Sequence, residues 1–458
     1  MKELFKIAFT YSGIEGLQKG IYFLIIPILT YYISASEYGN IAILLMVINF
    51  LQIFITFSIE STIMRFYVKI TNKKMKKIFL GTIFLSSLFF IVIWIIILVF
   101  IGPLFTKIFL SNIDFFPLVF LTILVVSFKM INLFYITFLK TIQDLKEFAI
   151  FYNIYFLLQT LLILYFIVNF HENKDYLYIK ALLISQVIPI FYVIYKVKKY
   201  IVFKINLKII KFTLLYSFSI IPIKIANIIN NSIDRYVLYT FINTSITGIY
   251  YLGWQISSIM QIVALALNSA YVPKFYRLYE ANKNIKNFEQ IYKMIDFIIL
   301  LILIIEIIFL NIYPFIFKYI SYSYLEAKNI LPIFIIFFAF NMVYFINTNA
   351  LSISYILNRK KIFGILIGIV VNLIISLYLV TDYGMYGVAI GSIIGQFITI
   401  LYFIFLVNKY MDFRFSNITY ILFILILFIV NYFQYYIGIK ICIDIILLGI
   451  YIKYKVIK

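Results

Sequence analysis

Long apolar runs separated by short polar breaks are the dominant pattern along this chain of 458 residues. The runs are close to the roughly 20 residues that a helix needs to cross a bilayer, and they are continuous, whereas a transmembrane strand alternates apolar and polar positions. The pattern therefore predicts an all-α polytopic membrane protein with about fourteen transmembrane helices. The expected spans are residues 10–33, 40–62, 78–101, 115–139, 148–168, 178–196, 211–238, 246–271, 291–313, 329–356, 361–380, 386–407, 416–434 and 437–453.

Composition supports this interpretation and excludes several classes of site. Hydrophobic residues make up 65% of the chain and charged residues 12%, whereas a soluble domain has about 45–50% and about 25%. The single cysteine, Cys442, excludes an intrachain disulfide framework. The single histidine, His171, excludes histidine-clustered metal sites and argues against a Ser-His-Asp hydrolase. We therefore expect no catalytic residue, no metal and no cofactor.

Basic residues outnumber acidic ones, 39 Lys and Arg against 18 Asp and Glu. Most of the basic residues fall in every second break between the apolar runs. These breaks include the lysine-rich stretches 73–77 and 196–211. Cytoplasmic loops of membrane proteins carry an excess of Lys and Arg, so this alternation predicts that both termini are cytoplasmic. The basic stretches are interpreted as orientation signals that also attract anionic headgroups, and no nucleic-acid partner is expected.

A short internal repeat divides the chain into two halves. Residues 33–41 align with residues 242–250 at a constant offset of 209, which pairs Gly39 with Gly248. Each copy follows a predicted helix that contains a proline and precedes another predicted helix. Six predicted helices separate the copies, so both lie the same way up, an arrangement found in transporters built from parallel repeats.

Basic residues at membrane depth are the main candidates for a binding site. A charge at the centre of a membrane helix costs about 2.5–3.5 kcal/mol, so its retention indicates an anionic ligand or a structural partner. Lys224 is the foremost candidate, because spacings of 3 and 7 residues place Asn227 and Asn231 on its helix face. The other basic residues at depth are Lys19, Lys129 and Arg235.

Each of these has an alternative interpretation. Lys19 follows Glu15 by four residues, so an ion pair within the helix is the alternative to ligand binding. Lys129 either faces a cavity, extends its side chain to the membrane surface by snorkelling, or packs within its lobe. Asp234 and Arg235 are adjacent and point apart on a helix, so they are expected to have different partners, with a structural role favoured for Asp234.

Acidic residues and polar rows complete the candidate set. Glu60 and Glu306 lie at membrane depth, and with Glu15 and Asp234 they are candidates to neutralise a cation or to carry a coupling ion, H⁺ or Na⁺. Two rows with helical spacing either line a cavity or join helices through polar contacts. They are Asn49, Gln52 and Thr56 in one predicted helix and Gln255, Ser258 and Gln261 in another.

Three stretches carry a family resemblance. Residues 219–273 place a proline early in the seventh predicted helix, then Asp234-Arg235, then Gly248-Ile249-Tyr250. Residues 27–41 and the glycine-rich residues 382–397 supply an opening and a late motif. Together these stretches resemble the O-antigen and capsule flippases, which are polysaccharide-biosynthesis proteins of the multidrug/oligosaccharidyl-lipid/polysaccharide exporter superfamily.

The resemblance implies two six-helix bundles, residues 1–200 and 201–410, in a V around a central cavity, with two peripheral helices in residues 411–458. It further implies a flippase of the bacterial cytoplasmic (inner) membrane. Such a protein moves undecaprenyl-diphosphate-linked oligosaccharide from the inner to the outer leaflet by alternating access. The implied partners are that lipid-linked oligosaccharide, membrane lipid, and a polysaccharide polymerase with its assembly proteins.

Two other functions compete with this one. An ion-coupled drug or metabolite exporter of the same superfamily would share the architecture, but its cavity is expected to be less cationic. A membrane glycosyltransferase or polymerase would place catalysis in sizeable outer loops. The predicted outer breaks are short, such as residues 34–39 and 381–385, and they contain no paired carboxylates. A transporter rather than an enzyme is therefore expected.

Overall fold

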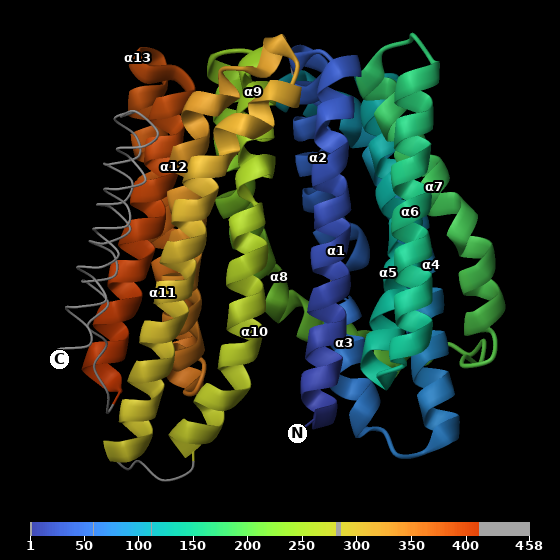
Figure 1. Ribbon diagram of the computed structural model, residues 1–458. Coiled ribbons are helices and arrows are strands. Elements are labelled where there is room, and N and C mark those ends of the chain that lie inside the picture. The colour runs from blue at the N-terminus through green and yellow to red at the C-terminus, as the bar shows by residue number, and fades with distance from the viewer. Residues whose placement is uncertain (1, 58, 111, 281–284, 412–458) are drawn as a thin grey trace. The chain divides into compact units, whose positions relative to one another are not determined.

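A computed structural model of the protein describes residues 2–57, 59–110, 112–280 and 285–411. Within these ranges every regular element is a helix (Figure 1). Ten helical stretches in the described part of the chain are long and apolar enough to cross a membrane, which confirms a multi-pass helical membrane protein. Within these ranges the chain forms two compact units, one from the described residues of 2–18 and 32–232 and one from those of 19–31 and 233–411. We call these the first and the second unit.

The first unit is organised around α5, Phe120–Ile142, which packs against five other helices. Its buried aromatic residues, among them Tyr135 and Phe138, fill the space between those neighbours. The elements of this unit are the start of α1 (Lys2–Tyr32), α2 (Ala35–Thr56), α3 (Ile59–Phe66), η1 (Tyr67–Lys69), α4 (Lys73–Phe109), η2 (Phe115–Val119), α5, α6 (Leu145–Asn169), α7 (Lys174–Val197) and most of α8 (Leu207–Phe241).

The second unit is organised around α12, Ala327–Leu351, which packs against α9, α10, α11 and α13. Residues 330–343 of α12 are all buried, as expected for a helix that is apolar on every side. The other elements are residues 19–31 of α1, the end of α8, α9 (Thr244–Ser257), α10 (Ile259–Glu280), α11 (Ile285–Ile316), η3 (Phe317–Tyr319), η4 (Tyr322–Tyr324) and α13 (Tyr355–Tyr410).

The compact units divide the chain inside α8, between Ser232 and Ile233, and also inside α1, after Gln18 and before Tyr32. The bundle boundary between residues 200 and 201 stays a prediction. The predicted spans 416–434 and 437–453, and almost all of the predicted peripheral segment 411–458, lie outside the described residues.

The internal repeat marks equivalent helix starts in the two units. α2 begins at Ala35 and α9 at Thr244, which is the predicted offset of 209. The residues before them, Ser34 and Asn243, both cap their helices by accepting a hydrogen bond from a backbone N–H three residues later. The pattern noticed in the sequence therefore corresponds to a shared local structure, a capped helix start.

Two predicted single helices are interrupted in the structure. The predicted span 40–62 is divided into α2 and α3, because Phe57 adopts a left-handed conformation with φ of 45° and ends α2. No glycine or proline marks this position in the sequence. The predicted span 246–271 is similarly divided at Ser258, between α9 and α10. The first of these breaks determines where Glu60 lies.

Glycines bring the two halves of α13 together. The predicted spans 361–380 and 386–407 are its two halves, separated by the non-helical Gly384, whose φ of 56° suits glycine. Beyond this kink the halves approach closely. A Cβ atom added at Gly395 would lie 2.5 Å from the backbone oxygen of Gly368 and 2.8 Å from Asn372 Cβ.

We expect Gly395→Ala to destabilise the protein by about 1–3 kcal/mol, because the added methyl group must separate the two halves of α13. Thermal unfolding of the detergent-solubilised protein measures this. Gly13→Ala is the matched control, since within the first unit no described atom lies within 4 Å of a Cβ built there. Equal unfolding temperatures for the two variants would contradict the close packing.

Candidate functional site

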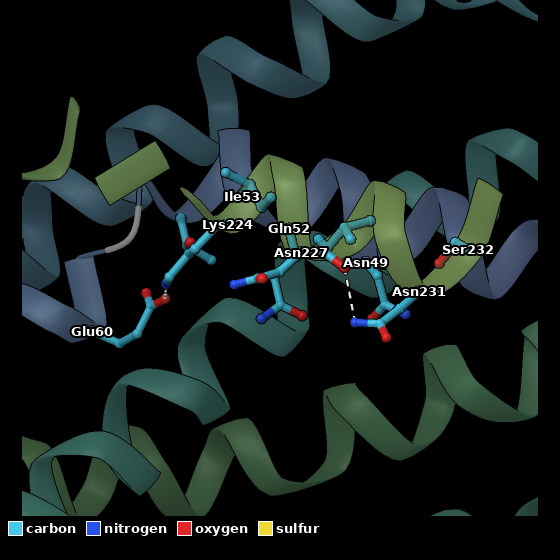
Figure 2. Close-up of a pocket in the computed structure, with 10 residues that line it drawn as sticks. Asn49, Gln52, Ile53, Glu60, Lys224, Asn227, Asn231 and Ser232 are labelled. Atoms are coloured by element: carbon cyan, nitrogen blue, oxygen red, sulfur yellow. Dashed lines mark hydrogen bonds and ion pairs between the residues drawn. The ribbon is translucent and has the colours of Figure 1, made fainter. Parts of the chain in front are cut away.

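A polar cavity of about 360 Å³ lies within the first unit, between α2, the start of α3 and α8 (Figure 2). Most of its lining residues carry an amide, a hydroxyl or a charge. They are Asn49, Gln52, Ile53, Thr56, Glu60, Lys224, Asn227, Ile228, Asn231 and Ser232. The cavity thus contains three of the predicted ligand-binding residues, one predicted charge partner and the first predicted polar row.

Helical periodicity explains why these residues face one another. On α8, Lys224, Asn227 and Asn231 follow the spacing i, i+3, i+7, which places them on one face. On α2, Asn49, Gln52 and Thr56 follow the same spacing. Each helix adds an isoleucine at i+4, so the two faces match position by position. Figure 2 shows the labelled side chains of both helices along the same cavity.

Lys224 forms an ion pair with Glu60, 164 residues earlier in the chain. Glu60 lies in the first turn of α3, where the positive end of the helix dipole favours a carboxylate. The break at Phe57 starts a new helix at this point and thereby brings Glu60 to the cavity. The pair is not sealed from its surroundings, since the Lys224 side chain is 31% exposed and that of Glu60 is 19% exposed.

The amides of the cavity supply further donors and acceptors. Asn231 Nδ2 donates to the backbone oxygen of Asn227 at 2.8 Å, which fixes the Asn231 side chain along α8. Among the described residues of the first unit, the side chains of Asn49, Gln52 and Asn227 have no hydrogen-bond partner. A carboxamide has two donor hydrogens and an acceptor oxygen, so these three groups are available to a polar ligand.

This arrangement can bind an anion and a polyhydroxylated group together. The ammonium group of Lys224 suits a phosphate oxygen, and the amides suit sugar hydroxyls. Glu60 is the anion that pairs with Lys224 in this structure. The ammonium group has three donor hydrogens, so an incoming phosphate competes with this carboxylate for the same cation.

Other predicted residues of the first unit lie elsewhere. Glu15 Oε1 is 3.2 Å from Lys140 Nζ, a partner that sequence spacing did not suggest. Lys129, in α5, is not among the residues that line the cavity. One turn later, Asn132 is fully buried and donates to the backbone oxygen of Gln186 at 2.9 Å.

Asp234 is the centre of a buried hydrogen-bond network in the second unit. The side chain is 2% exposed and accepts hydrogen bonds from Tyr250 Oη at 3.1 Å, Asn372 Nδ2 at 3.0 Å and Ser392 Oγ at 2.6 Å. These donors come from α9 and from both halves of α13. Sequence reasoning paired none of them with Asp234. Tyr250 belongs to the same quoted motif, but nothing in the motif indicates this contact, and Asn372 and Ser392 are 138 and 158 residues away.

Arg235 has different surroundings from its neighbour, as the helix geometry predicts. Its guanidinium carbon lies 4.9 Å from the centre of the Tyr251 ring and 5.6 Å from that of Trp254. Such cation–π contacts stabilise a desolvated cation, and Arg235 is only 8% exposed.

Two further predicted residues lie in the second unit. Lys19 is exposed, whereas Glu306 in α11 is fully buried.

Comparison with known proteins agrees with the predicted family. A family model described as polysaccharide biosynthesis protein matches residues 4–279, more than half of the chain. Among solved structures, the chain is similar to the lipid II flippase MurJ in an inward closed conformation, with a TM-score of 0.72, 18% identity and 99% of both chains covered. No curated protein sequence matches the chain.

Two MATE transporters show the same fold. A variant of the MATE transporter VcmN from Vibrio cholerae matches with a TM-score of 0.60 and 17% identity, over 89% of this chain and 96% of that one. The MATE multidrug transporter DinF-BH matches with a TM-score of 0.60 and 14% identity over the same shares. At these identities the structural likeness shows the fold alone. Because the family model covers most of the sequence, the chain belongs to the polysaccharide biosynthesis protein family.

Proposed function

We propose that this protein is a flippase that moves a lipid-linked oligosaccharide, carried on undecaprenyl diphosphate, across a bacterial cytoplasmic membrane. The observation that carries the proposal is the cavity in which Lys224 lies among free amides. The phosphates and sugars of such a lipid must cross about 30 Å of hydrocarbon, while its prenyl chain remains in lipid. A polar cavity with one exchangeable cation meets that requirement.

In this proposal each group of the cavity has a separate task. Lys224 binds a phosphate oxygen, and Glu60 holds Lys224 when no substrate is present. Asn49, Gln52 and Asn227 bind sugar hydroxyls in place of water. Because Glu60 returns to Lys224 when the phosphate leaves, the ion pair prevents the site from retaining its anionic substrate too tightly.

The finer parts of the proposal follow the family resemblance. The substrate is an O-antigen or capsule repeat unit, both termini are cytoplasmic, and two bundles alternate access to the two leaflets. Apart from the resemblance, we propose that a cation, H⁺ or Na⁺, drives the cycle through one of the membrane carboxylates, of which Asp234 is the first to test. A polysaccharide polymerase with its assembly proteins receives the product.

A binding and transport assay separates this function from its rivals. We expect the purified protein to bind farnesyl diphosphate, and not the cationic dye ethidium, in a titration followed by tryptophan fluorescence. In liposomes, we expect it to move a fluorescent prenyl diphosphate bearing one N-acetylglucosamine to the leaflet where dithionite quenches it. Binding of ethidium without the diphosphate would identify a drug exporter. Transfer of the sugar to an acceptor would identify an enzyme.

A further inference from the structure

The connection between α7 and α8 is attached to the start of α4 by hydrogen bonds. We call residues 198–206 the docked linker. The N–H of Val202 donates to the backbone oxygen of Lys77 at 3.1 Å. Thr82 Oγ1 donates to the backbone oxygen of Lys204 at 2.9 Å and accepts from the N–H of Asn206 at 3.2 Å. These bonds attach the second part of the linker, residues 202–206, to residues 77–82 of α4.

The approach of the docked linker to α4 depends on Gly81. A Cβ atom added there would lie 1.9 Å from the backbone oxygen of Val202, a distance that no side chain can accept. The linker is therefore seated against the helix by backbone contact as well as by the Thr82 hydroxyl. A loop that only connects two helices needs neither the close backbone contact at Gly81 nor the hydrogen bonds of Thr82.

Docking brings together two basic stretches that are more than 100 residues apart in the sequence. The stretch at the start of α4 and the stretch from the linker into α8 contain no Asp or Glu between residues 61 and 82 or between residues 197 and 217. Their exposed lysines are Lys73, Lys74, Lys77, Lys198, Lys199, Lys204, Lys208 and Lys211. Docking therefore places two lysine-rich stretches, neither of which contains an acid in its own sequence, next to each other.

Exposed apolar side chains alternate with these lysines along the linker. Phe203 is 64% exposed, Ile205 56% and Leu207 76%. The surface lies where two spans end, because α4 begins at Lys73 and α7 ends at Val197. Apolar side chains next to lysines at the end of membrane spans are typical of segments that lie in the headgroup layer, with apolar groups inserted and ammonium groups on phosphates.

We propose that the docked linker and the start of α4 form a binding surface for anionic phospholipid headgroups. The ligand class is a phosphate-bearing lipid with net negative charge, such as phosphatidylglycerol. The lysines bind the phosphates, and Phe203, Ile205 and Leu207 contact the upper part of the acyl chains. This inference does not depend on the transported substrate, and its test uses neither transport nor substrate binding.

Native mass spectrometry of the full-length protein in an equimolar mixture of phosphatidylglycerol and phosphatidylcholine tests the proposal. We expect the wild-type protein to retain phosphatidylglycerol preferentially. Replacing Lys204, Lys208 and Lys211 with Gln is expected to lower the ratio of bound anionic to zwitterionic lipid at least about fivefold, the effect of a single charge at an anionic surface. Size-exclusion profiles confirm that each variant is folded.

Two further variants make the result decisive. The triple Gln variant of Lys107, Lys318 and Lys328 removes the same charge outside the proposed surface and is expected to leave the ratio within twofold. Thr82→Val keeps every charge but removes both side-chain hydrogen bonds to the linker, and is expected to lower the ratio at least twofold. An equal loss in the control triple variant, or no loss in Thr82→Val, would overturn the proposal, because lysines acting as independent charges would then suffice.

Discussion

Lys224→Ala is expected to leave the protein folded and inserted in the membrane. In cells whose surface glycan depends on this protein, the variant is expected to abolish that glycan. The substitution removes the cation of the cavity and leaves Glu60 as an unpaired negative charge facing the incoming diphosphate. Loss of a charge-assisted hydrogen bond costs about 1.5–3 kcal/mol, and repulsion by Glu60 adds to this. Binding of farnesyl diphosphate is therefore expected to weaken at least about 100-fold.

Variants of Glu60 distinguish two effects of Lys224→Ala: loss of the contact between Lys224 and phosphate, and repulsion between Glu60 and phosphate. Glu60→Gln removes the carboxylate that competes with phosphate for Lys224, so we expect binding of farnesyl diphosphate to strengthen several-fold while turnover slows. In Lys224→Ala combined with Glu60→Gln, binding should recover part of the loss. A double-mutant cycle over these variants gives the interaction energy of the pair.

Lys180→Ala is the matched control for this series. Lys180 is a partly buried lysine of the same unit, it contacts the rings of Phe166 and Tyr176, and it does not line the cavity. We expect normal surface glycan in this variant. Normal surface glycan in Lys224→Ala would remove Lys224 from the site.

The part of the cavity contributed by a single helix could be predicted from the sequence. Helix periodicity is local, so the spacing of Lys224, Asn227 and Asn231 was enough to place them on one face, and the same argument applies to Asn49 and Gln52. Periodicity alone could not predict whether that face is directed toward a cavity or toward a neighbouring helix. Polar residues on a membrane helix point to a cavity or to a neighbouring helix, and only packing decides between these.

Contacts between distant segments could not be predicted. The pairing of Lys224 with Glu60 depends on the break at Phe57, where a left-handed residue ends α2 without any glycine or proline to signal it. The predicted uninterrupted helix would have carried Glu60 to a different position. By contrast, the repeat at an offset of 209 residues could be detected in the sequence. Each of its two copies contains a capped helix start, and a few adjacent residues are enough to form one.

Asp234 was predicted to be structural or to couple transport to an ion, and its network makes both roles testable. Three donors converge on this buried carboxylate from α9 and the two halves of α13. In Asp234→Ala these donors lose their acceptor, and a buried donor left without a partner costs about 1–3 kcal/mol. We expect thermal unfolding in detergent to show a loss of that size.

The conservative variants distinguish the two roles of Asp234. Tyr250→Phe removes one donor and is expected to cost about 1 kcal/mol, without affecting transport. Asp234→Asn keeps an acceptor oxygen and the size of the side chain, so stability should fall less than in Asp234→Ala. If Asp234 also couples transport to a cation, Asp234→Asn loses the dependence of flipping on a H⁺ or Na⁺ gradient. If Asp234→Asn is instead stable and its flipping still depends on the gradient, the role of Asp234 is limited to joining α8, α9 and α13. The network would then need an acceptor at this position but not a charge.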